Sequence, residues 1–391
     1  MSSPFFTIVI PTRNGHKFLP YALATCLKQV DFDDFEVIVS DNSDVGNNLS
    51  YEAIKEHIGD RVRYIRPPEA LNQQKHWQWI LDSGNINGEY VMYMGDDDGL
   101  TRDALREYYE CIKATGAEAV MSNPLRYQWS GFEYPPTYVA RNNVGAFCRI
   151  VPNNGEQYHI MNSEEVFQKA LDFDPAGLAR LPCVYWGMVK RELIVSIGKK
   201  YGEYFDVTVD YYSAFLTAYN LKKYALVDKA LCIMGYSIKS VTYSVNLKEP
   251  NTVKPKITTY MCGVTWSSAA GIRISIEILA EKILMSKKLP IFGYCKALWI
   301  ECLTSVRGGS IGKRVRGLLL HAFKYHYLMP LFLAFVFLAI KKTKNTLIGK
   351  ARRETIIQYK HYSGEEWGFS DVDSFAQVAY DFCFSEDIPN S

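Results

Sequence analysis

The sequence predicts an α/β protein built on a doubly wound, mostly parallel sheet, followed by a helical C-terminal region. Short apolar runs at residues 6–10, 35–40, 62–65 and 89–94 alternate with amphipathic segments, an alternation typical of parallel sheets. Each run is followed by polar residues, which should meet along the carboxyl edge of the sheet. Apolar residues at helical spacing in 266–306 predict the second part.

Helices, a further strand and long loops are expected to complete the α/β part. Helices are expected at residues 18–27, 50–58, 72–81, 101–115 and 162–171, with another one opening near Asp210. Residues 119–123 predict a strand. Residues 124–160 are rich in Pro, Asn, Tyr and Gly, so we expect long loops and short hairpins there. The domain prediction is 1–250, with halves 1–122 and 123–250, followed by the region 251–391.

Size and composition set the broad class. The chain has 391 residues, 48% hydrophobic and 22% charged, which is globular rather than disordered. Its nine cysteines are scattered through apolar segments without C-x-x-C spacing, so reduced thiols in a cytosolic compartment are expected. The N-terminus shows no signal-peptide pattern. The net charge of +2 gives no indication of a nucleic-acid partner, and none is expected.

Three consecutive carboxylates, Asp96, Asp97 and Asp98, follow the run at 89–94. Adjacent anions repel one another, so a bound cation would explain the cluster. Hard ions such as Mg²⁺ and Mn²⁺ use one or two carboxylates together with substrate phosphate oxygens. The alternative is a solvated acidic turn.

Two phosphate-binding classes are disfavoured. The chain has no G-x-G-x-x-G after its first strand and no G-x-x-x-x-G-K-[ST]. A dinucleotide oxidoreductase and a P-loop NTPase would therefore lack their phosphate cradles. Phosphate charge would have to be met by a metal at the triplet instead.

The ordered segments TIVIPTRNG, FEVIVSDNSD and GEYVMYMGDDDG resemble the family 2 glycosyltransferases of the GT-A fold, over about residues 5–245. The resemblance implies a nucleotide-diphosphate-sugar donor, usually a UDP-sugar, a Mn²⁺ or Mg²⁺ cofactor, and transfer with inversion at the anomeric carbon. It implies that Asp41 accepts a hydrogen bond from the base and that Asp98, with Asp96, binds the metal. Donor-binding residues are expected at Pro11, Thr12, Arg13, Asn14, Asp41, Ser43, Lys75, Asp96, Asp97 and Lys239, with His76 as a further candidate.

The acceptor half is expected to supply the general base and a stacking surface. By resemblance, the base is an Asp opening a helix, and Asp210 occupies that position. Val209 stands where the family usually has an acid, so Asp206 remains a rival, and either carboxylate could instead be a favourable charge at a helix N-terminus. Tyr185 and Trp186 are expected to bind the acceptor sugar, with core packing as the alternative.

The C-terminal region changes character at residue 307. Residues 307–353 contain eleven Lys or Arg and no acid, and residues 325–340 form a sixteen-residue apolar run. That run is short for a membrane span. It suits an interfacial segment on anionic lipid, or else a buried helix or an oligomer interface. Residues 354–391, with eight acids and Lys360 alone as a cation, are expected to fold back on the basic region or to be mobile.

These observations predict a metal-dependent inverting glycosyltransferase of bacterial surface polysaccharide synthesis, such as lipopolysaccharide or capsule. The acceptor would be a glycan or a polyprenyl-linked glycan, and the enzyme would be cytoplasmic, at the cytoplasmic face of the inner membrane when attached. The absence of a Q-x-x-R-W motif favours addition of one or a few sugars. The alternatives are a catalytically silent nucleotide-sugar-binding or scaffold protein and a sugar nucleotidyltransferase.

Overall fold

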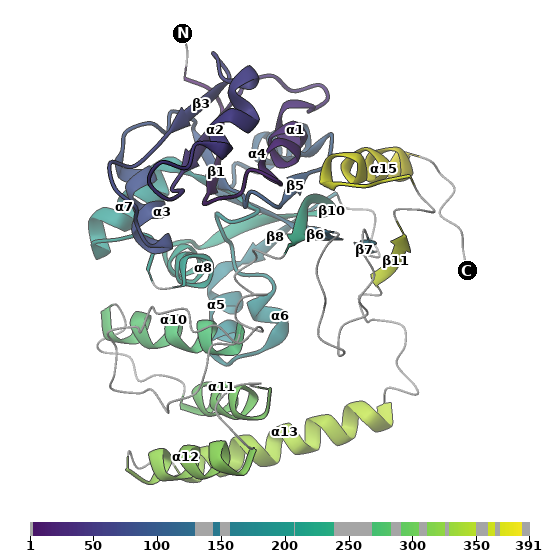
Figure 1. Cartoon of the computed structure of the whole chain (residues 1–391). Coiled ribbons are helices and arrows are strands. Elements are labelled where there is room, and N and C mark those ends of the chain that lie inside the picture. The colour runs from purple at the N-terminus through teal and green to yellow at the C-terminus, as the bar shows by residue number, and fades with distance from the viewer. Residues whose placement is uncertain are drawn as a thin grey trace.

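The computed structural model places an α/β part above a stack of C-terminal helices (Figure 1). It describes residues 3–129, 144–148, 157–206, 208–237, 268–282, 291–304, 311–324, 328–348, 359–363 and 368–384.

Four parallel strands form the N-terminal half of the sheet, in the order β3-β2-β1-β4. Their bounds are Phe6–Thr12 for β1, Phe35–Asp41 for β2, Val62–Ile65 for β3 and Tyr90–Tyr93 for β4. Because all four run in the same direction, the polar residues that follow them lie along one edge. The predicted α/β class is confirmed.

Alternate side chains of these strands enter two separate cores, as a doubly wound sheet requires. Phe6, Ile8 and Ile10 of β1 pack in the core that contains α1, α2 and α4, whereas Val9 packs in the core that contains α3, α7 and α8. The helices are α1 (Leu19–Leu27), α2 (Leu49–Ile54), η1 (Lys55–His57), α3 (Gln73–Asp82), α4 (Ala104–Thr115), α7 (Arg191–Tyr201) and α8 (Val209–Asn220).

The second half of the sheet mixes strand directions. β9 is antiparallel to both β4 and β6, whereas β10 is parallel to β6. These strands are β5 (Gly99–Leu100), β6 (Ala119–Gln128), β7 (Val144–Cys148), β8 (Tyr158–Asn162), β9 (Met188–Lys190), β10 (Lys223–Tyr236) and β11 (Tyr359–Ser363). Two helices, α5 (Ser163–Leu171) and α6 (Pro175–Leu178), lie between β8 and β9 in the chain.

The expectation of a loop from residue 124 onward is wrong for residues 124–128. β6 continues through Pro124 because its partner β10 shifts register there, between Val227 and Cys232. A proline is tolerated in a strand at such an irregularity.

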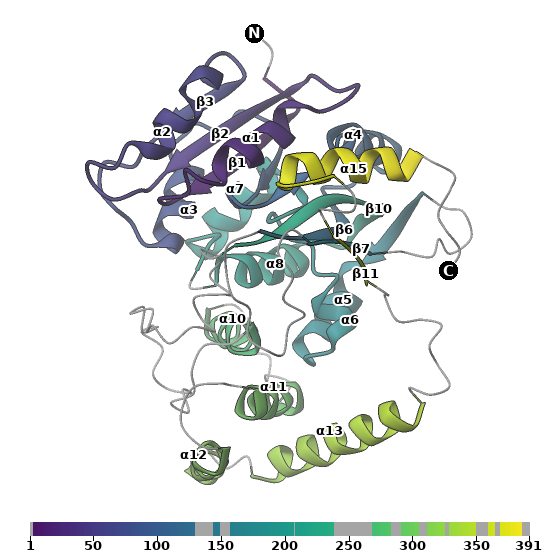
Figure 2. The same cartoon turned by 45° about the vertical axis from the view of Figure 1, so that its right-hand side comes forward.

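Below the sheet, the C-terminal helices pack in successive layers (Figures 1 and 2). α10 (Ser268–Lys282) packs on α8, α11 (Ile291–Thr304) packs on α10, and α12 (Ile311–Lys324) and α13 (Leu328–Ile348) pack on α11. No helix among the described residues is long and apolar enough to cross a membrane.

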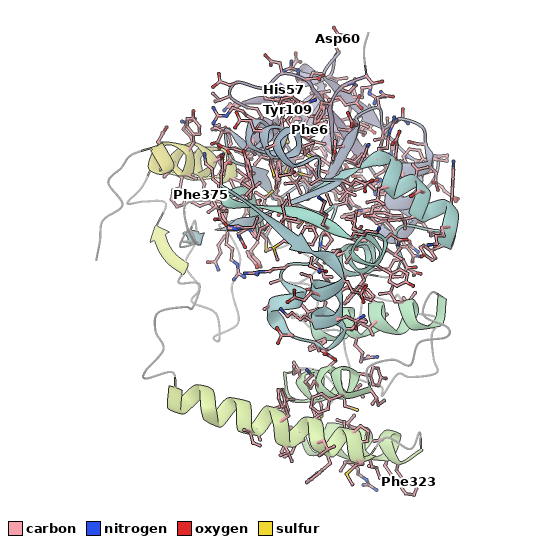
Figure 3. The ribbon with its side chains drawn as sticks, turned by 180° about the vertical axis from the view of Figure 1, so that it is seen from behind. Phe6, His57, Asp60, Tyr109, Phe323 and Phe375 are labelled. Atoms are coloured by element: carbon pink, nitrogen blue, oxygen red, sulfur yellow. The ribbon has the colours of Figure 1, made fainter. Side chains whose placement is uncertain are left out.

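The last helix, α15 (Val372–Phe384), lies against α1 rather than on the basic helices (Figure 2). Its Phe375 is fully buried and stacks on Tyr127 of β6 at 5.6 Å between ring centroids, and it points towards the sheet in Figure 3. For this described part of the acidic tail, folding back on the basic region is therefore wrong.

Candidate active site

The ends of β1 and β4 meet at the acidic triplet. Thr12, the last residue of β1, donates its hydroxyl hydrogen to Asp96 Oδ2 at 2.5 Å. Gly15 leaves room for this contact, because a Cβ at that position would lie 1.7 Å from Asp96 Oδ2. The parallel sheet thus brings together two segments that are 84 residues apart in the chain.

The end of β2 forms a second polar centre around Asp41, which is completely buried. Its Oδ2 accepts a hydrogen bond from the Tyr64 hydroxyl at 2.6 Å, and its Oδ1 accepts one from the backbone N–H of Ser43 at 2.8 Å. Arg66 Nη1 lies 3.7 Å from Asp41 Oδ2. The predicted base-binding carboxylate is therefore already fixed by neighbouring donors.

The turn after β1 is tied to the turn after β2. Asn14 takes a left-handed backbone conformation with φ of 56°, which Asn tolerates better than most residues. Its N–H donates to Ser43 Oγ at 2.7 Å. Arg13 pairs with Asp44 at 3.0 Å, but both side chains are more than half exposed, so this pair adds little stability. Pro11 lies within β1, opposite Ser40.

Helix α3 begins beside this centre because Asn72 caps it, accepting the backbone N–H of Lys75 at 2.8 Å. The side chain of Lys75 is exposed. The next residue, His76, is buried, and its Nε2 lies 2.8 Å from Ser40 Oγ. Burial lowers the pKa of His76 to about 4, so the ring is neutral at physiological pH.

Asp98 is the most constrained of the three acids, with 1% of its surface exposed. Its Oδ2 accepts hydrogen bonds from the Tyr185 hydroxyl at 2.8 Å, Trp186 Nε1 at 2.7 Å and the Gly95 N–H at 3.0 Å. Its Oδ1 accepts the Gly235 N–H at 2.7 Å. Burial, and then the neighbouring Asp97 charge, raise the pKa of Asp98 to about 7. A carboxylate has about four acceptor sites, so protein donors use those of Asp98.

Asp97 is half-buried and is held by the residues that follow β6 and β10. Its carbonyl accepts Trp129 Nε1 at 2.8 Å, and its Oδ2 accepts the Ser237 hydroxyl at 2.6 Å. A Cβ on Gly235 would lie 1.7 Å from the Asp97 carbonyl oxygen. Only glycine therefore allows β10 to approach the acidic turn this closely.

Tyr185 and Trp186 lie beside the triplet and point their polar atoms at Asp98. Tyr185 forms an isolated bridge with Tyr93 at the end of β4, and the Trp186 N–H donates to the Tyr93 carbonyl at 3.1 Å. Trp186 has a φ of 64°, which is uncommon for a bulky residue and marks stored strain. Both side chains are partly buried, so these rings position the acidic turn, and acceptor stacking on them stays a prediction.

Asp210 is the second residue of helix α8. Burial raises the pKa of its carboxyl group. The Cys183 thiol lies 3.5 Å from the Asp210 carbonyl oxygen, which joins α8 to the loop that carries Tyr185. The pKa of Tyr185 is raised by burial and by the charges of Asp98, Asp97 and Asp210. Asp98 thus accepts a hydrogen bond from Tyr185, and the charges of Asp97 and Asp210 act on the same hydroxyl group.

The rival base, Asp206, is buried on the loop before α8. Its charge contributes to the raised pKa of Tyr212, after burial. Lys239 lies outside the described residues. Within the described part of the chain, no group of three or more His, Cys, Asp or Glu side chains is arranged to hold a metal ion.

Sequence reasoning missed the partners that fix the acids. These are Tyr64 and Arg66 at Asp41, Trp129 and Ser237 at Asp97, and Gly235 at Asp98. For Gly235, a glycine inside a strand is a signal of close backbone approach. The aromatic and hydroxyl donors carry no such signal, because similar residues are common in cores.

Comparisons with known proteins agree with this arrangement. The family model described as Glycosyl transferase family 2 matches residues 7–181. The GalNAc(5)-diNAcBac-PP-undecaprenol beta-1,3-glucosyltransferase of Campylobacter jejuni is 31% identical over 109 residues, which cover 26% of this chain and 32% of the relative. The chain thus spans about a third of that relative's length.

Solved structures of S. aureus TarS are more distant. TarS 1–349 in complex with UDP-GlcNAc is 14% identical with a TM-score of 0.45, over 83% of this chain and 73% of that one. A longer TarS structure is 15% identical with a TM-score of 0.42, over 78% and 49%. Structural similarity at this TM-score is too low to indicate a shared function. By the family match, the segment 7–181 is similar to the family 2 glycosyltransferases, and the fold, with parallel strands and an acidic turn at their edge, is the α/β fold predicted from the sequence.

Proposed function

We propose that this enzyme transfers a sugar, with inversion, from a UDP-sugar to a lipid-linked glycan in bacterial surface polysaccharide synthesis. The observation that carries the proposal is that Asp98 of the triplet accepts a hydrogen bond from Tyr185, while Cys183 joins the same loop to the Asp210 carbonyl on α8. Transfer needs a site for the donor diphosphate and a carboxylate for the acceptor proton. The acidic triplet is proposed for the first role and Asp210 for the second.

Asp210 is proposed as the general base. It would take the proton of the acceptor hydroxyl while that oxygen bonds to the anomeric carbon and the bond to the diphosphate breaks. Burial raises its pKa, which makes the carboxylate a better proton acceptor near neutral pH. Asp206 is the less favoured candidate, because it is buried on the loop before α8, whereas Asp210 lies in the first turn of α8, which Cys183 joins to the loop of Tyr185.

The proposed cofactor is Mn²⁺ or Mg²⁺, with Asp98 and Asp96 as its predicted ligands. The residues present fit such an ion, since hard cations need only one or two carboxylates beside phosphate and water oxygens. Asp96 is half-buried and accepts a hydrogen bond from Thr12. Asp98 would have to exchange a protein donor for the ion. When bound, the ion would neutralise charge on the leaving diphosphate.

The donor would extend from the triplet towards Asp41, which lies at the end of β2. The lipid-linked acceptor is proposed because the Campylobacter relative is named for an undecaprenol-linked substrate. Such an acceptor lies at a bilayer surface, so we place the enzyme at the cytoplasmic face of the membrane.

The proposal is tested with purified full-length protein and a panel of nucleotide-sugars. We expect one UDP-sugar, with Mn²⁺ or Mg²⁺, to raise the melting temperature, and EDTA to abolish the shift. Turnover should release nucleoside diphosphate. Release of pyrophosphate would indicate a nucleotidyltransferase, and metal-independent binding without turnover would indicate a silent binding protein.

A matched pair of variants tests the metal. Asp96→Ala should raise the metal concentration needed for this thermal shift. Thr12→Val removes the hydrogen bond to Asp96 and, because Thr12 is also a predicted donor-binding residue, should lower donor affinity while leaving the metal requirement within a few-fold of wild type. Equal metal titrations for Asp96→Ala and wild type would exclude Asp96 as a ligand.

A further inference from the structure

The helices farthest from the sheet expose an unusual amount of apolar surface. Of the nineteen large apolar side chains exposed in the described residues, eleven lie on α12 and α13. We call this surface the α12–α13 face. Its members are Ile311, Leu319, Leu320, Phe323, Leu328, Met329, Phe332, Leu333, Phe335, Phe337 and Ile340. Concentration of exposed apolar residues in one place marks an interaction site.

Helix α13 is apolar on opposite sides. Leu331 and Ala334 are buried against α11. Met329, Leu333 and Ile340 lie on the other side of the same helix and are 68%, 51% and 60% exposed. A helix that is apolar all round normally lies within a protein core or a lipid phase. The side of α13 that carries Met329, Leu333 and Ile340 is instead exposed to water in the isolated chain.

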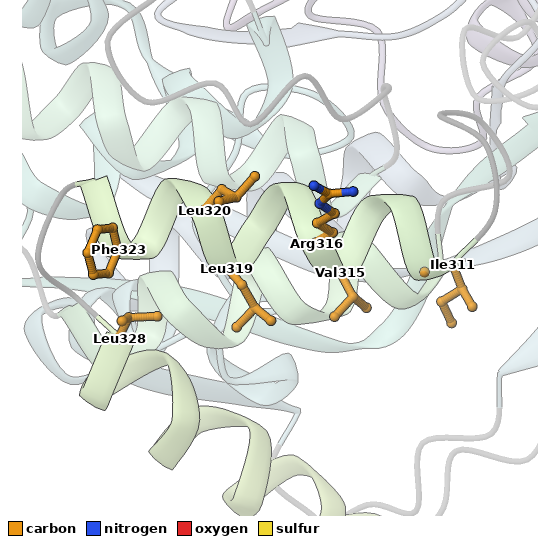
Figure 4. A pocket seen from close by; sticks show the side chains of 8 residues that line it. Ile311, Val315, Arg316, Leu319, Leu320, Phe323 and Leu328 are labelled. Carbon is orange, nitrogen blue, oxygen red and sulfur yellow. The ribbon is translucent and has the colours of Figure 1, made fainter.

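Helix α12 adds a groove beside α13, with a volume of about 710 Å³. Ile311, Val315 and Leu319 line it at four-residue spacing along α12, and Leu328 of α13 completes it (Figure 4). Arg316 is the charged residue among its lining residues. An apolar groove with a guanidinium beside it suits an anionic phospholipid. The acyl chain would lie in the groove, and the head-group phosphate would pair with the arginine.

The charge of residues 307–353 indicates which partner binds the α12–α13 face. Residues 307–353 contain eleven Lys or Arg and no acid, and Arg316 lines the groove, so the sequences of α12 and α13 carry net positive charge, which disfavours pairing of two copies. An anionic bilayer would instead be attracted, at about 1 kcal/mol for each cation near its surface. We propose that the α12–α13 face docks on the surface of an anionic membrane, with the apolar side chains entering the interface and no helix crossing it.

The stack of helices links this face to the proposed active site. α11 packs on both α13 and α10, and α10 packs on α8, the helix that carries Asp210. The Thr208 hydroxyl, just before α8, hydrogen-bonds the Ser275 hydroxyl of α10. Docking through α12 and α13 would therefore hold Asp210 at a fixed height above the lipid surface. This inference does not depend on the identity of donor or acceptor.

The test is flotation of the full-length protein with vesicles of phosphatidylglycerol and phosphatidylcholine, compared with phosphatidylcholine alone. We expect binding to the anionic vesicles that weakens as salt is raised. The triple variant Met329→Gln, Leu333→Gln and Ile340→Gln should reduce partitioning at least tenfold. The control triple variant Val45→Gln, Leu49→Gln and Tyr51→Gln, equally exposed but on the α/β part, should bind as wild type does.

Two further measurements keep the result decisive. If the triple variant fails to fold, the single variant Phe323→Gln takes its place in the test. The Phe323 side chain is 70% exposed, and we expect its replacement to weaken binding to the vesicles several-fold. Light scattering reports oligomeric state. Absence of wild-type binding to anionic vesicles, unchanged binding of the triple variant, or a dimer that forms through this face without lipid binding would each overturn the proposal.

Discussion

Replacing Asp373 by alanine should destabilise the α/β part more than any surface charge removal. Asp373, in the first turn of α15, pairs through Oδ1 with Arg102 Nη2 at 2.7 Å. Arg102 is 4% exposed and Asp373 is 15% exposed on their side chains. Removal of Asp373 therefore leaves a guanidinium buried without its counter-charge.

The expected loss follows from the surroundings of Arg102. Breaking a buried ion pair by removing one partner costs about 3–5 kcal/mol. Arg102 keeps two acceptors in the variant, the carbonyl of residue 373 at 2.8 Å and Gln377 Oε1 at 3.1 Å. We therefore expect the lower end of the range, about 3 kcal/mol. Lys28, which also pairs with Asp373, is 58% exposed, so its share is less than about 1 kcal/mol.

The assay is urea unfolding of full-length protein, followed by tryptophan fluorescence and circular dichroism. Asp381→Ala is the matched control, because Asp381 lies exposed in the same helix and accepts a hydrogen bond from Gln377 Nε2 at 2.8 Å. Lys28→Ala separates the surface pair. The double variant Arg102→Met with Asp373→Ala removes both buried charges and should recover most of the loss. If Asp373→Ala and Asp381→Ala unfold at the same urea concentration, the burial argument for Arg102 is wrong.

Three other predictions concern the site. Asp210→Asn should lower turnover by about 10²–10⁴-fold, the range for a lost general base, with the donor dissociation constant nearly unchanged; a dead Asp206→Asn beside an active Asp210→Asn would move the assignment. Gly235→Ala should lower donor affinity and the melting temperature, because its Cβ collides with the Asp97 carbonyl. Gly59→Ala, which meets nothing within 4 Å, is the control. His76 has a folded pKa of about 4, below its ordinary 6.5, so the unfolded chain binds more protons between these values. The contribution of neutral His76 to the free energy of unfolding is therefore complete above pH 6.5 and is lost as the pH falls to about 4. Between pH 6.5 and pH 4, the free energy of unfolding of wild type should fall by up to about 3 kcal/mol more than that of His76→Gln. Parallel curves of unfolding free energy against pH would contradict this prediction.

Local patterns were enough to predict the first four strands and the edge where their polar ends meet. The apolar runs that became β1, β2 and β4 are short, and Thr12, Asp41 and Asp96 come at or just after their ends, whereas Arg66 follows β3. Parallel pairing then brings Thr12 to Asp96 without any further information. Local signals suffice here because each strand pairs with neighbours that obey the same rule.

The supports of the acidic turn depend on contacts that local patterns do not encode. Trp129 reaches Asp97 across 32 positions, and Gly235 reaches Asp98 across 137. β6 passes through Pro124 only because β10 shifts register beside it. The docking of α15 depends on Phe375 meeting Tyr127 and on Asp373 meeting Arg102. Each event pairs residues whose own neighbourhoods are unremarkable, so tertiary structure had to supply them.

Loss of activity on replacing Asp98 would not by itself identify this carboxylate as a metal ligand. Its replacement by alanine would leave the Gly235 N–H, the Tyr185 hydroxyl and the Trp186 indole N–H without their acceptor, each at a cost of about 1–3 kcal/mol when buried. Trp186 already holds a strained φ, and its bond to Asp98 opposes relaxation. Loss of transfer in Asp98→Ala therefore reports collapse of the turn as readily as loss of a metal ligand. Asp96 and Asp97 are half-buried, so their variants separate the metal requirement from the folding of the turn.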